Sequence, residues 1–153
     1  EATEAISPVV FWRKEFREDS GGAGQWRGGL GQIIEIGGAD GIPFDVLAMF
    51  ERVNNAPKGR EDGLDGRAGQ VSLVSGTRLQ AKGQQSIPPG DSLRLEMAGG
   101  GGVGNPRRRS PERVARDVRN GIVSKDAARD LYAVALDAAG RVDSEQTEQL
   151  RSG

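Results

Sequence analysis

The residue types that most often carry out enzyme chemistry near neutral pH are missing from this chain. It contains no histidine and no cysteine, so it has neither a side chain whose ordinary pKa lies near neutrality nor a thiolate nucleophile. Serine–histidine catalysis, cysteine–histidine catalysis and thiolate zinc sites are therefore excluded within it. Carboxylate, lysine, tyrosine and serine groups remain, but they form no recognisable catalytic constellation. The sequence predicts that this chain alone has no catalytic residues and no metal ligands.

Glycine is the most conspicuous residue type, with 24 copies. Two runs stand out, 19–31 with six glycines and 99–104 with five. Because glycine has no Cβ atom, it serves where the backbone turns tightly or approaches another chain closely. Two explanations stay open here: tight turns with close strand packing, or close approach to a ligand or a partner subunit.

The glycine runs do not match a nucleotide-binding motif. Gly99, Gly101 and Gly104 have the spacing of a dinucleotide-binding fingerprint, but a true fingerprint opens directly into a helix within a strand–helix–strand unit. Asn105 and Pro106 interrupt the run here, and only helices are predicted after it. The Walker phosphate loop is absent. We therefore expect no cofactor bound by these glycines.

The segment 62–66 resembles a fragment of a calcium loop. Its carboxylates, Asp62 and Asp65, stand on a glycine-bent backbone and could converge on a hard cation. Their spacing and number fit neither an EF-hand nor a nonapeptide repeat. We interpret the segment as a solvated loop.

One concentrated basic run follows the second glycine run. Its arginines are Arg107, Arg108, Arg109, Arg113, Arg116 and Arg119. Arginine forks suit phosphate and carboxylate groups, but Glu112 and Asp117 interleave and no aromatic residues alternate with the arginines. We interpret the run as a solvated face or a subunit rim.

The overall charge and hydropathy argue against nucleic-acid and membrane partners. A net charge of −1 gives no global field that attracts nucleic acid or anionic lipid. No apolar run approaches the roughly 20 residues that cross a bilayer. We expect a soluble, cytoplasmic protein.

Residues 1–105 predict a glycine-rich β domain, of sandwich or barrel-like type. Short apolar segments are separated by Gly, Pro, Asn or Asp, as in all-β proteins. The segments are Val9 to Arg17, Gln32 to Ile36, Phe44 to Val53, Gln70 to Val74, Thr77 to Ala81 and Asp91 to Met97. Turns are expected at Ser75-Gly76 and at 88–91. In the last segment Leu93, Leu95 and Met97 share one face and Arg94 and Glu96 the other, so one face packs and the other is wet or meets a partner.

Residues 106–153 predict a helical tail that packs on the β domain or on a neighbouring domain. Ser110 and Pro111 signal the start of a helix that closes at Asn120-Gly121. A second helix is expected from Ser124 to just before Gly140, with an apolar stripe. That stripe is Ala128, Leu131, Tyr132 and Ala135. A third is expected at 144–151, with Asp143 and Gln146 spaced as a capping box.

Several motifs occur in a set order along nearly the whole chain. They are Asp19-Ser20-Gly21-Gly22-Ala23-Gly24, Trp26-Arg27-Gly28-Gly29-Leu30-Gly31, Pro57-Lys58-Gly59, Pro89-Gly90-Asp91, Gly99 to Gly102 with Gly104 and Pro106, Pro111-Glu112-Arg113-Val114, Asp117-Val118, Gly121-Ile122-Val123-Ser124, Ala127-Ala128 and Tyr132. In this order they resemble the C-terminal part of the hydantoinase B/oxoprolinase family, which includes N-methylhydantoinase and acetone carboxylase alpha-type subunits. Val103 stands where that family usually has an aromatic residue, and Asn105 where it usually has Asp.

The resemblance implies part of a large subunit that works with a hydantoinase A-type ATP-binding subunit or domain. Such assemblies open a cyclic amide, for example hydantoin, N-methylhydantoin or 5-oxoproline, with hydrolysis of ATP. ATP and a divalent metal are implied for the full assembly, with ligands that lie in the rest of the subunit or on the partner. This piece would supply a β scaffold and subunit contacts.

The resemblance and the glycine runs together give the candidates for substrate or interface contacts. They are Asp19, Ser20, Gly21, Gly22, Arg27, Gly28, Gly29, Gly99, Gly100, Gly101, Gly102 and Arg107. A purely structural explanation stays open beside this one, because Asp and Ser before glycines commonly cap turns through their side chains. Two other functions also stay open: a ketone carboxylase subunit, and a non-catalytic β module that binds a protein partner.

Overall fold

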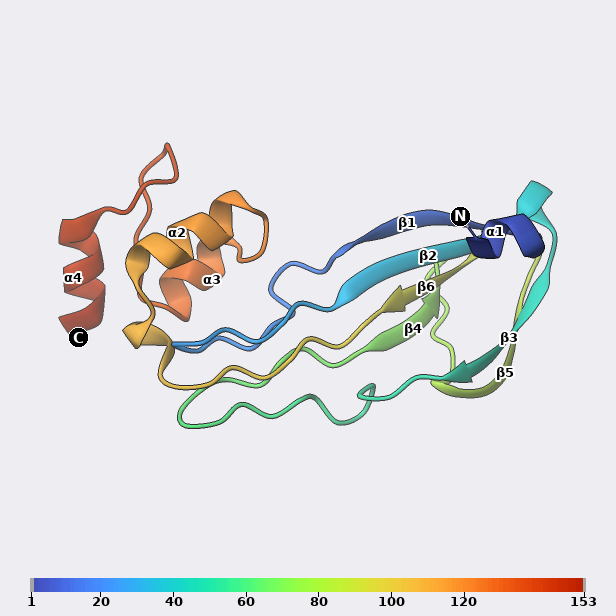
Figure 1. Ribbon diagram of the computed structural model, residues 1–153, viewed down its shortest axis with the longest axis horizontal. Helices are drawn as coiled ribbons and strands as arrows, with labels where there is room; N and C mark the ends of the chain where they lie inside the picture. Colours follow the sequence, from blue (N-terminus) through green and yellow to red (C-terminus); the bar gives the residue numbers. More distant parts are fainter. Residues whose placement is uncertain (1, 153) are drawn as a thin grey trace.

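The structure is a computed structural model that describes residues 2–152. The molecule is elongated, with a β region at one end, helices at the other and long extended segments between them (Figure 1). This is the predicted fold class, mainly β with a helical C-terminal appendage. A short N-terminal helix, α1 (Ala2–Ile6), was not predicted.

Four strands form one antiparallel sheet in the order β1-β2-β6-β4. They are β1 (Val9–Phe16), β2 (Gln32–Gly38), β4 (Gln70–Leu73) and β6 (Ser92–Glu96). Leu95 lies opposite Ile34 on one side and Val71 on the other. Because directly paired residues point to the same face, this row is apolar, while the next row, through Arg94 and Glu35, is charged.

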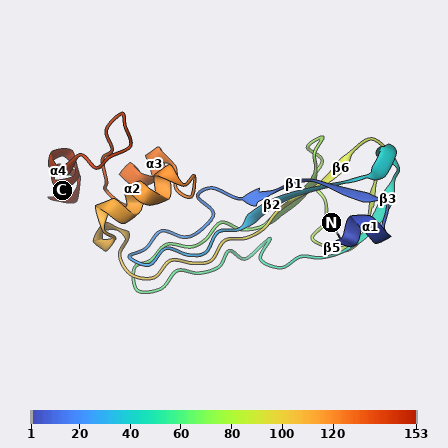
Figure 2. The same cartoon turned by 45° about the horizontal axis from the view of Figure 1, so that its top comes forward.

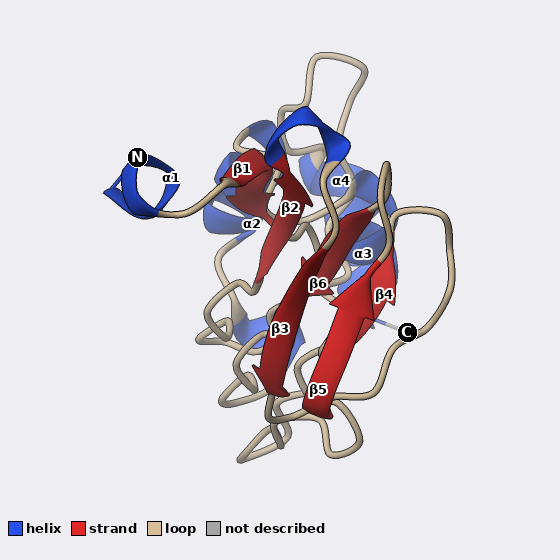
Figure 3. Cartoon of the chain, turned by 90° about the vertical axis from the view of Figure 1, so that its right-hand side faces the viewer, coloured by secondary structure: helices blue, strands red, loops and turns tan. Residues whose placement is uncertain are grey.

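A two-stranded ribbon, β3 (Phe44–Met49) with β5 (Lys82–Ile87), lies next to the sheet (Figure 3). The hydrophobic core of the β region is made of buried residues from both. It comprises Val71, Leu73, Ile87, Leu93 and Leu95, with Phe44 and Val46 packed against it. The predicted packed face of the last strand is therefore confirmed for Leu93 and Leu95, but it is wrong for Met97, which lies beyond the strand and is 39% exposed.

The predicted strand from Thr77 to Ala81 is wrong. Arg78 makes only an isolated bridge to Ser72, and the strand of this region is Lys82–Ile87. That hexapeptide shows little apolar alternation, so its sequence does not predict a strand. It becomes one because it pairs with β3 along its whole length and because Ile87, 1% exposed, anchors it in the core.

The two predicted turns are confirmed. Around Ser75-Gly76 the chain reverses, and the Leu73 N–H donates to the Thr77 carbonyl oxygen at 2.8 Å. At 88–91 the Asp91 N–H donates to the Pro88 carbonyl oxygen at 3.3 Å. The largest difference in strand length is in β3, which ends at Met49 and not at Val53, whereas β1, β4 and β6 each end one residue earlier than predicted.

The tail contains three α-helices, as predicted. They are α2 (Pro111–Arg119), α3 (Lys125–Asp130) and α4 (Ser144–Ser152), preceded by a 3-10 turn at Pro106–Arg108. The Ser124 Oγ accepts the Ala127 N–H at 3.1 Å, which caps α3. The Asp143 Oδ1 accepts the Gln146 N–H at 3.0 Å, as half of the predicted capping box.

The second helix of the tail is shorter than predicted. It ends at Asp130, because Ala133 adopts a left-handed φ of 52° that an α-helix cannot contain. Beyond that point Leu136 forms a bridge with Val142. Tyr132 is nevertheless buried at 1% exposure, whereas Leu131 is 42% exposed.

A second hydrophobic cluster lies in the helical region. It comprises Ala23, Val114, Val123, Ala128, Tyr132 and Val134. Ala23 belongs to the first glycine run, so that run reaches the core of the tail. Within residues 2–152 there is no helix of the length and hydrophobicity that a bilayer crossing requires.

Candidate functional site

The two glycine runs meet in the extended region between the sheet and the helices, together with the segment 57–69 (Figure 2). We call these three segments, 20–31, 57–69 and 98–104, the glycine bundle. The Gly22 N–H donates to the Gly100 carbonyl oxygen at 2.8 Å, and the Gly100 N–H donates to the Gly29 oxygen at 2.8 Å. The Gly102 N–H donates to the Leu64 oxygen at 2.9 Å. The segment 98–104 therefore forms backbone hydrogen bonds with more stretches of the chain than the two that a strand in a sheet can pair with.

Glycine is required in this bundle because the backbones touch. A methyl group on Gly28 would overlap the Gly100 carbonyl oxygen, and one on Gly101 would overlap the Lys58 oxygen. Of the glycines in 99–104, only Gly104 has a left-handed φ, at 74°. Close approach within the chain, and not turn geometry, explains the density of glycine. Gly29 is different, because a Cβ there would meet no atom within 4 Å.

Four amide groups of the bundle are already used by its own carbonyl groups. A phosphate-binding loop needs several free N–H groups that point at the anion. Those of Gly22, Gly28, Gly100 and Gly102 all donate to carbonyl oxygens of the bundle. Among residues 2–152, no three acidic side chains converge as a metal site. These four amide groups are therefore not available to a phosphate group.

The candidate Asp19 joins the bundle to the helices. Its φ is 56°, a conformation that Asp and Asn tolerate better than most residues. Its Oδ1 accepts the Ser124 N–H at 2.8 Å, and its own N–H donates to the Ile122 carbonyl oxygen at 3.1 Å. Asp19 thus fixes the turn that leads into α3.

The candidate Arg27 also reaches the helical tail. Its Nε lies 3.4 Å from the Asp117 Oδ2, and its Nη1 donates to the Gly28 carbonyl oxygen at 2.7 Å. The same Asp117 oxygen lies 2.7 Å from the Nη2 of Arg109. Two guanidinium groups from different parts of the chain therefore share one carboxylate.

This junction is buried. Arg109 is 8% exposed and Asp117 is 4% exposed. The Arg109 Nη1 donates to the Gln25 carbonyl oxygen at 3.1 Å, while its Nε has no hydrogen-bond partner. Burial raises the pKa of the neighbouring Tyr132 to about 12. The sequence placed Arg109 in a basic run interpreted as a solvated face or a subunit rim, which is wrong for this buried residue. The only feature of the sequence that pointed to this buried ion pair was the Asp117-Val118 motif.

The remaining candidates divide into buried and exposed residues. Ser20 is fully buried, where its Oγ donates to the Arg17 carbonyl oxygen at 2.5 Å and accepts the Gly31 N–H at 2.9 Å. Arg107 is exposed, and its guanidinium makes no hydrogen bond or ion pair with residues 2–152. The structure thus brings the glycines, Asp19, Ser20 and Arg27 together, but not Arg107.

The backbone of the candidate calcium-loop fragment is part of the glycine bundle, since the Leu64 N–H donates to the Ala23 carbonyl oxygen at 2.7 Å. The Asp65 carboxylate lies 2.7 Å from the Lys58 Nζ and accepts the Gly59 N–H at 2.9 Å. The hydrogen bond from Lys58 holds the pKa of Asp65 below its ordinary value. The prediction of a solvated loop therefore holds for the exposed side chains of Asp62 and Asp65, but it is wrong for the backbone, where Gly66 is buried.

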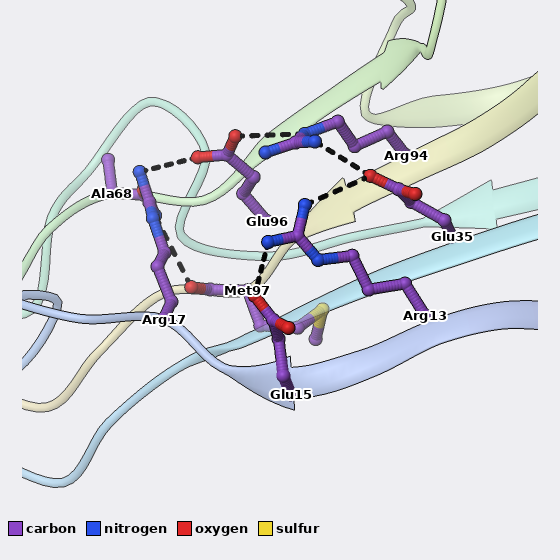
Figure 4. Close-up of polar contacts among 8 residues, drawn as sticks. All are labelled: Arg13, Glu15, Arg17, Glu35, Ala68, Arg94, Glu96 and Met97. Atoms are coloured by element: carbon purple, nitrogen blue, oxygen red, sulfur yellow. Dashed lines mark hydrogen bonds and ion pairs between the residues drawn. The ribbon is translucent and has the colours of Figure 1, made fainter. Parts of the chain in front are cut away.

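The charged face of the sheet carries a network that crosses three strands and reaches the segment after β1 (Figure 4). Its members are Arg13, Glu15, Arg17, Glu35, Arg94 and Glu96. Arg94 is the centre, with Nη1 2.7 Å from the Glu35 Oε1 and Nε 3.2 Å from the Glu96 Oε1. Because positive and negative groups are equal in number, the network neutralises itself and offers no unpaired charge to a ligand.

A family model described as hydantoinase B/oxoprolinase matches residues 1–106. This chain belongs to the hydantoinase B/oxoprolinase family. The B component of a putative D-/L-hydantoinase of Pseudomonas sp. (strain NS671) is 34% identical, over 99% of this chain and 26% of its own length. The beta component of the caprolactamase of Pseudomonas jessenii is 32% identical, over 99% of this chain and 27% of its own length. The chain therefore spans about a quarter of the length of these relatives.

Two solved structures have the same fold. The ATP-dependent caprolactamase from Pseudomonas jessenii matches with a TM-score of 0.79 and 29% identity, over 98% of this chain and 27% of that one. A nucleotide-free acetone carboxylase structure matches with a TM-score of 0.71 and 21% identity, over 95% of this chain and 24% of that one. The helical tail is included in both matches, although it lies beyond the family model.

Val103 and Asn105, the two positions at which the sequence was expected to depart from the family pattern, lie at the helical end of the bundle. Val103 pairs with Trp26 and with Arg60 as isolated bridges. The Asn105 Oδ1 accepts the Arg107 N–H at 2.9 Å, which caps the 3-10 turn. Asn and Asp are equivalent as N-caps, so the Asn in this family member keeps the cap.

Proposed function

We propose that this chain is the C-terminal part of a hydantoinase B/oxoprolinase-type subunit, and that it contributes scaffold and subunit contacts to ATP-dependent hydrolysis of a cyclic amide. Hydantoin, N-methylhydantoin and 5-oxoproline are the proposed substrates. The observation that carries this proposal is the match of nearly the whole chain to about a quarter of an ATP-dependent caprolactamase. A cytoplasmic location is part of the proposal.

The geometry supports a scaffold role. The bundle packs backbone against backbone, and the Asp19 and Arg27 contacts tie it to the helices. A region held in this way keeps its shape while the surfaces it presents meet other parts of an assembly. We assign the ligands of ATP and of a divalent metal to the rest of the subunit or to a hydantoinase A-type partner subunit or domain, as the family resemblance implies.

Cyclic amide hydrolysis is better supported than ketone carboxylation. The named relatives at 31–34% identity include a hydantoinase component, a caprolactamase component and 5-oxoprolinase 1 of Arabidopsis thaliana. The acetone carboxylase structure, at 21% identity, supports the fold alone. The contacts of the chain are also compatible with a non-catalytic module that binds a protein partner, but no observation favours that function over the family match.

The test is phosphate release by the assembled enzyme. The complete subunit that contains this chain would be co-expressed with the hydantoinase A-type subunit of the same organism, and ATP hydrolysis would be measured with each cyclic amide. Release that depends on one of these amides and on both subunits is expected, with this chain alone inactive. Release that depends on acetone and bicarbonate would replace the proposal by a ketone carboxylase, and the absence of a complex would favour the interaction module.

A further inference from the structure

An exposed aromatic residue and the basic run come together at the helical end of the glycine bundle. Trp26 is 59% exposed, and the guanidinium carbon of Arg113 lies 5.7 Å from the centre of its ring. At this distance a cation and an aromatic face attract each other. The sequence showed no aromatic residue among the arginines because Trp26 is supplied by the other glycine run.

These residues line a hollow of about 270 Å³. Its lining is Gln25, Trp26, Arg108, Arg109, Ser110 and Arg113. The arginines of the hollow differ in whether they have an ion-pair partner. Arg109 is held by Asp117 and by the Gln25 carbonyl group, whereas Arg108 and Arg113 are exposed and form no ion pair with residues 2–152.

The positive charge around the hollow is only partly balanced, because neither Arg108 nor Arg113 forms an ion pair within residues 2–152. Glu112 is the nearest acidic residue in the sequence, and its carboxylate accepts a hydrogen bond from Ser110. Asp117 is buried and shared between Arg27 and Arg109. The exposed guanidinium groups are therefore complementary to an acidic ligand.

The size and composition of the hollow favour a protein segment over a nucleotide. Pockets for small ligands and cofactors usually enclose about 300–1,000 Å³, and this hollow lies below that range. Exposed tryptophan and arginine are the residue types that dominate binding energy at protein interfaces. A carboxylate side chain fits the space and the charge.

We propose that the hollow formed by Trp26, Arg108 and Arg113 is a docking point for an acidic segment of a partner subunit. The segment places a carboxylate between the guanidinium groups of Arg108 and Arg113, neither of which has an ion pair, while its neighbouring atoms cover the part of the indole ring that is still exposed. This inference rests on the proposed function, in which the chain contacts a partner subunit, and it names the surface that makes the contact.

The chain allows a direct binding test, because it has two tryptophans. In a Trp12→Phe variant, fluorescence reports on Trp26 alone. The probe is a hexaglutamate peptide with both ends blocked, titrated at low and at high salt. We expect a saturable change in Trp26 emission that weakens as salt shortens the range of the electrostatic attraction.

Matched variants locate the binding. Arg113→Gln is expected to weaken binding about tenfold, the loss of one charge-assisted contact. Arg78→Gln removes the same charge from an exposed arginine in the β region, which also has no ion pair with residues 2–152, and is expected to change nothing. Calorimetry on the unaltered chain with the same peptide gives the affinity without replacing Trp12.

Three results would overturn the inference. They are the absence of saturable binding, an equal loss in Arg78→Gln and Arg113→Gln, and tighter binding of inorganic phosphate than of hexaglutamate. The last would make the ligand a phosphate group. These failures leave amide-dependent phosphate release untouched, so they are distinguishable from failure of the proposed function. In the assembled enzyme Arg113→Glu should weaken subunit association, whereas Arg78→Glu should not.

Discussion

The Oδ2 atom of Asp117 lies 2.7 Å from the Nη2 of Arg109 and 3.4 Å from the Nε of Arg27, in the boundary between the glycine bundle and α2. The two arginines come from opposite sides of that boundary. A buried carboxylate that serves two cations is costly to remove, because both cations then stay behind without it. The orientation of the helical tail on the bundle therefore depends on one side chain.

Replacing this carboxylate should destabilise the protein strongly. We expect Asp117→Asn to lower the free energy of unfolding by about 3–5 kcal/mol, since two guanidinium groups lose their counter-charge in a buried site. Urea denaturation measures the change. Asp130→Asn is the control, because its ion pair with Arg129 is exposed on both sides and should contribute about 1 kcal/mol or less. Equal effects of the two variants would contradict a central role for Asp117.

Two adjacent glycines give a sharp test of the bundle. Gly28→Ala should cost about 1–3 kcal/mol or more, because the added methyl group overlaps the Gly100 carbonyl oxygen and backbone must move. Gly29→Ala meets open space and has no left-handed φ, so it should change stability by less than about 1 kcal/mol. Thermal unfolding of both variants measures the difference. A similar cost at both positions would mean that glycine is needed there for another reason.

Alkaline pH should destabilise the protein through its single tyrosine. Burial raises the pKa of Tyr132 to about 12, from an ordinary value of 10.0. The stability that this gives is fully present below pH 10 and is lost as the pH rises through 12, because the unfolded state releases the proton first. Absorbance of tyrosinate against pH should show a midpoint near 12 in buffer and near 10 in denaturant. A midpoint at the ordinary value in both would show that the ring is accessible.

Two substitutions can separate a structural role of Asp19, as the hydrogen-bond acceptor at the turn into α3, from a chemical role of its carboxylate in the reaction. Asp19→Ala removes the acceptor for the Ser124 N–H and should cost about 1–2 kcal/mol. Asp19→Asn keeps both the acceptor and the tolerance of left-handed φ, so stability should be close to that of the unaltered chain. Melting curves measure this. In the assembled enzyme Asp19→Asn should also retain ATP hydrolysis; its loss in a stable protein would give the carboxylate a part in the reaction.

Several conclusions came from local signals in the sequence. The absence of histidine and cysteine excluded whole classes of chemistry, and the turn at 88–91 and the start of α2 at Pro111 follow from the conformational preferences of Pro and Gly. The order of the glycine motifs indicated the family, which the family model confirms. Such signals act between residues that are close in sequence, so they can be interpreted without knowing the fold.

Other features were decided only by tertiary structure. Lys82–Ile87 is a strand because β3 pairs with it, and α3 ends where Ala133 turns to a left-handed φ. The pair of Arg27 with Asp117 spans 90 positions in the sequence. The sequence determined that the two glycine runs carry almost no side chains. Only the tertiary structure decided which backbone atoms these glycines contact, because contacts between distant segments depend on how the whole chain packs.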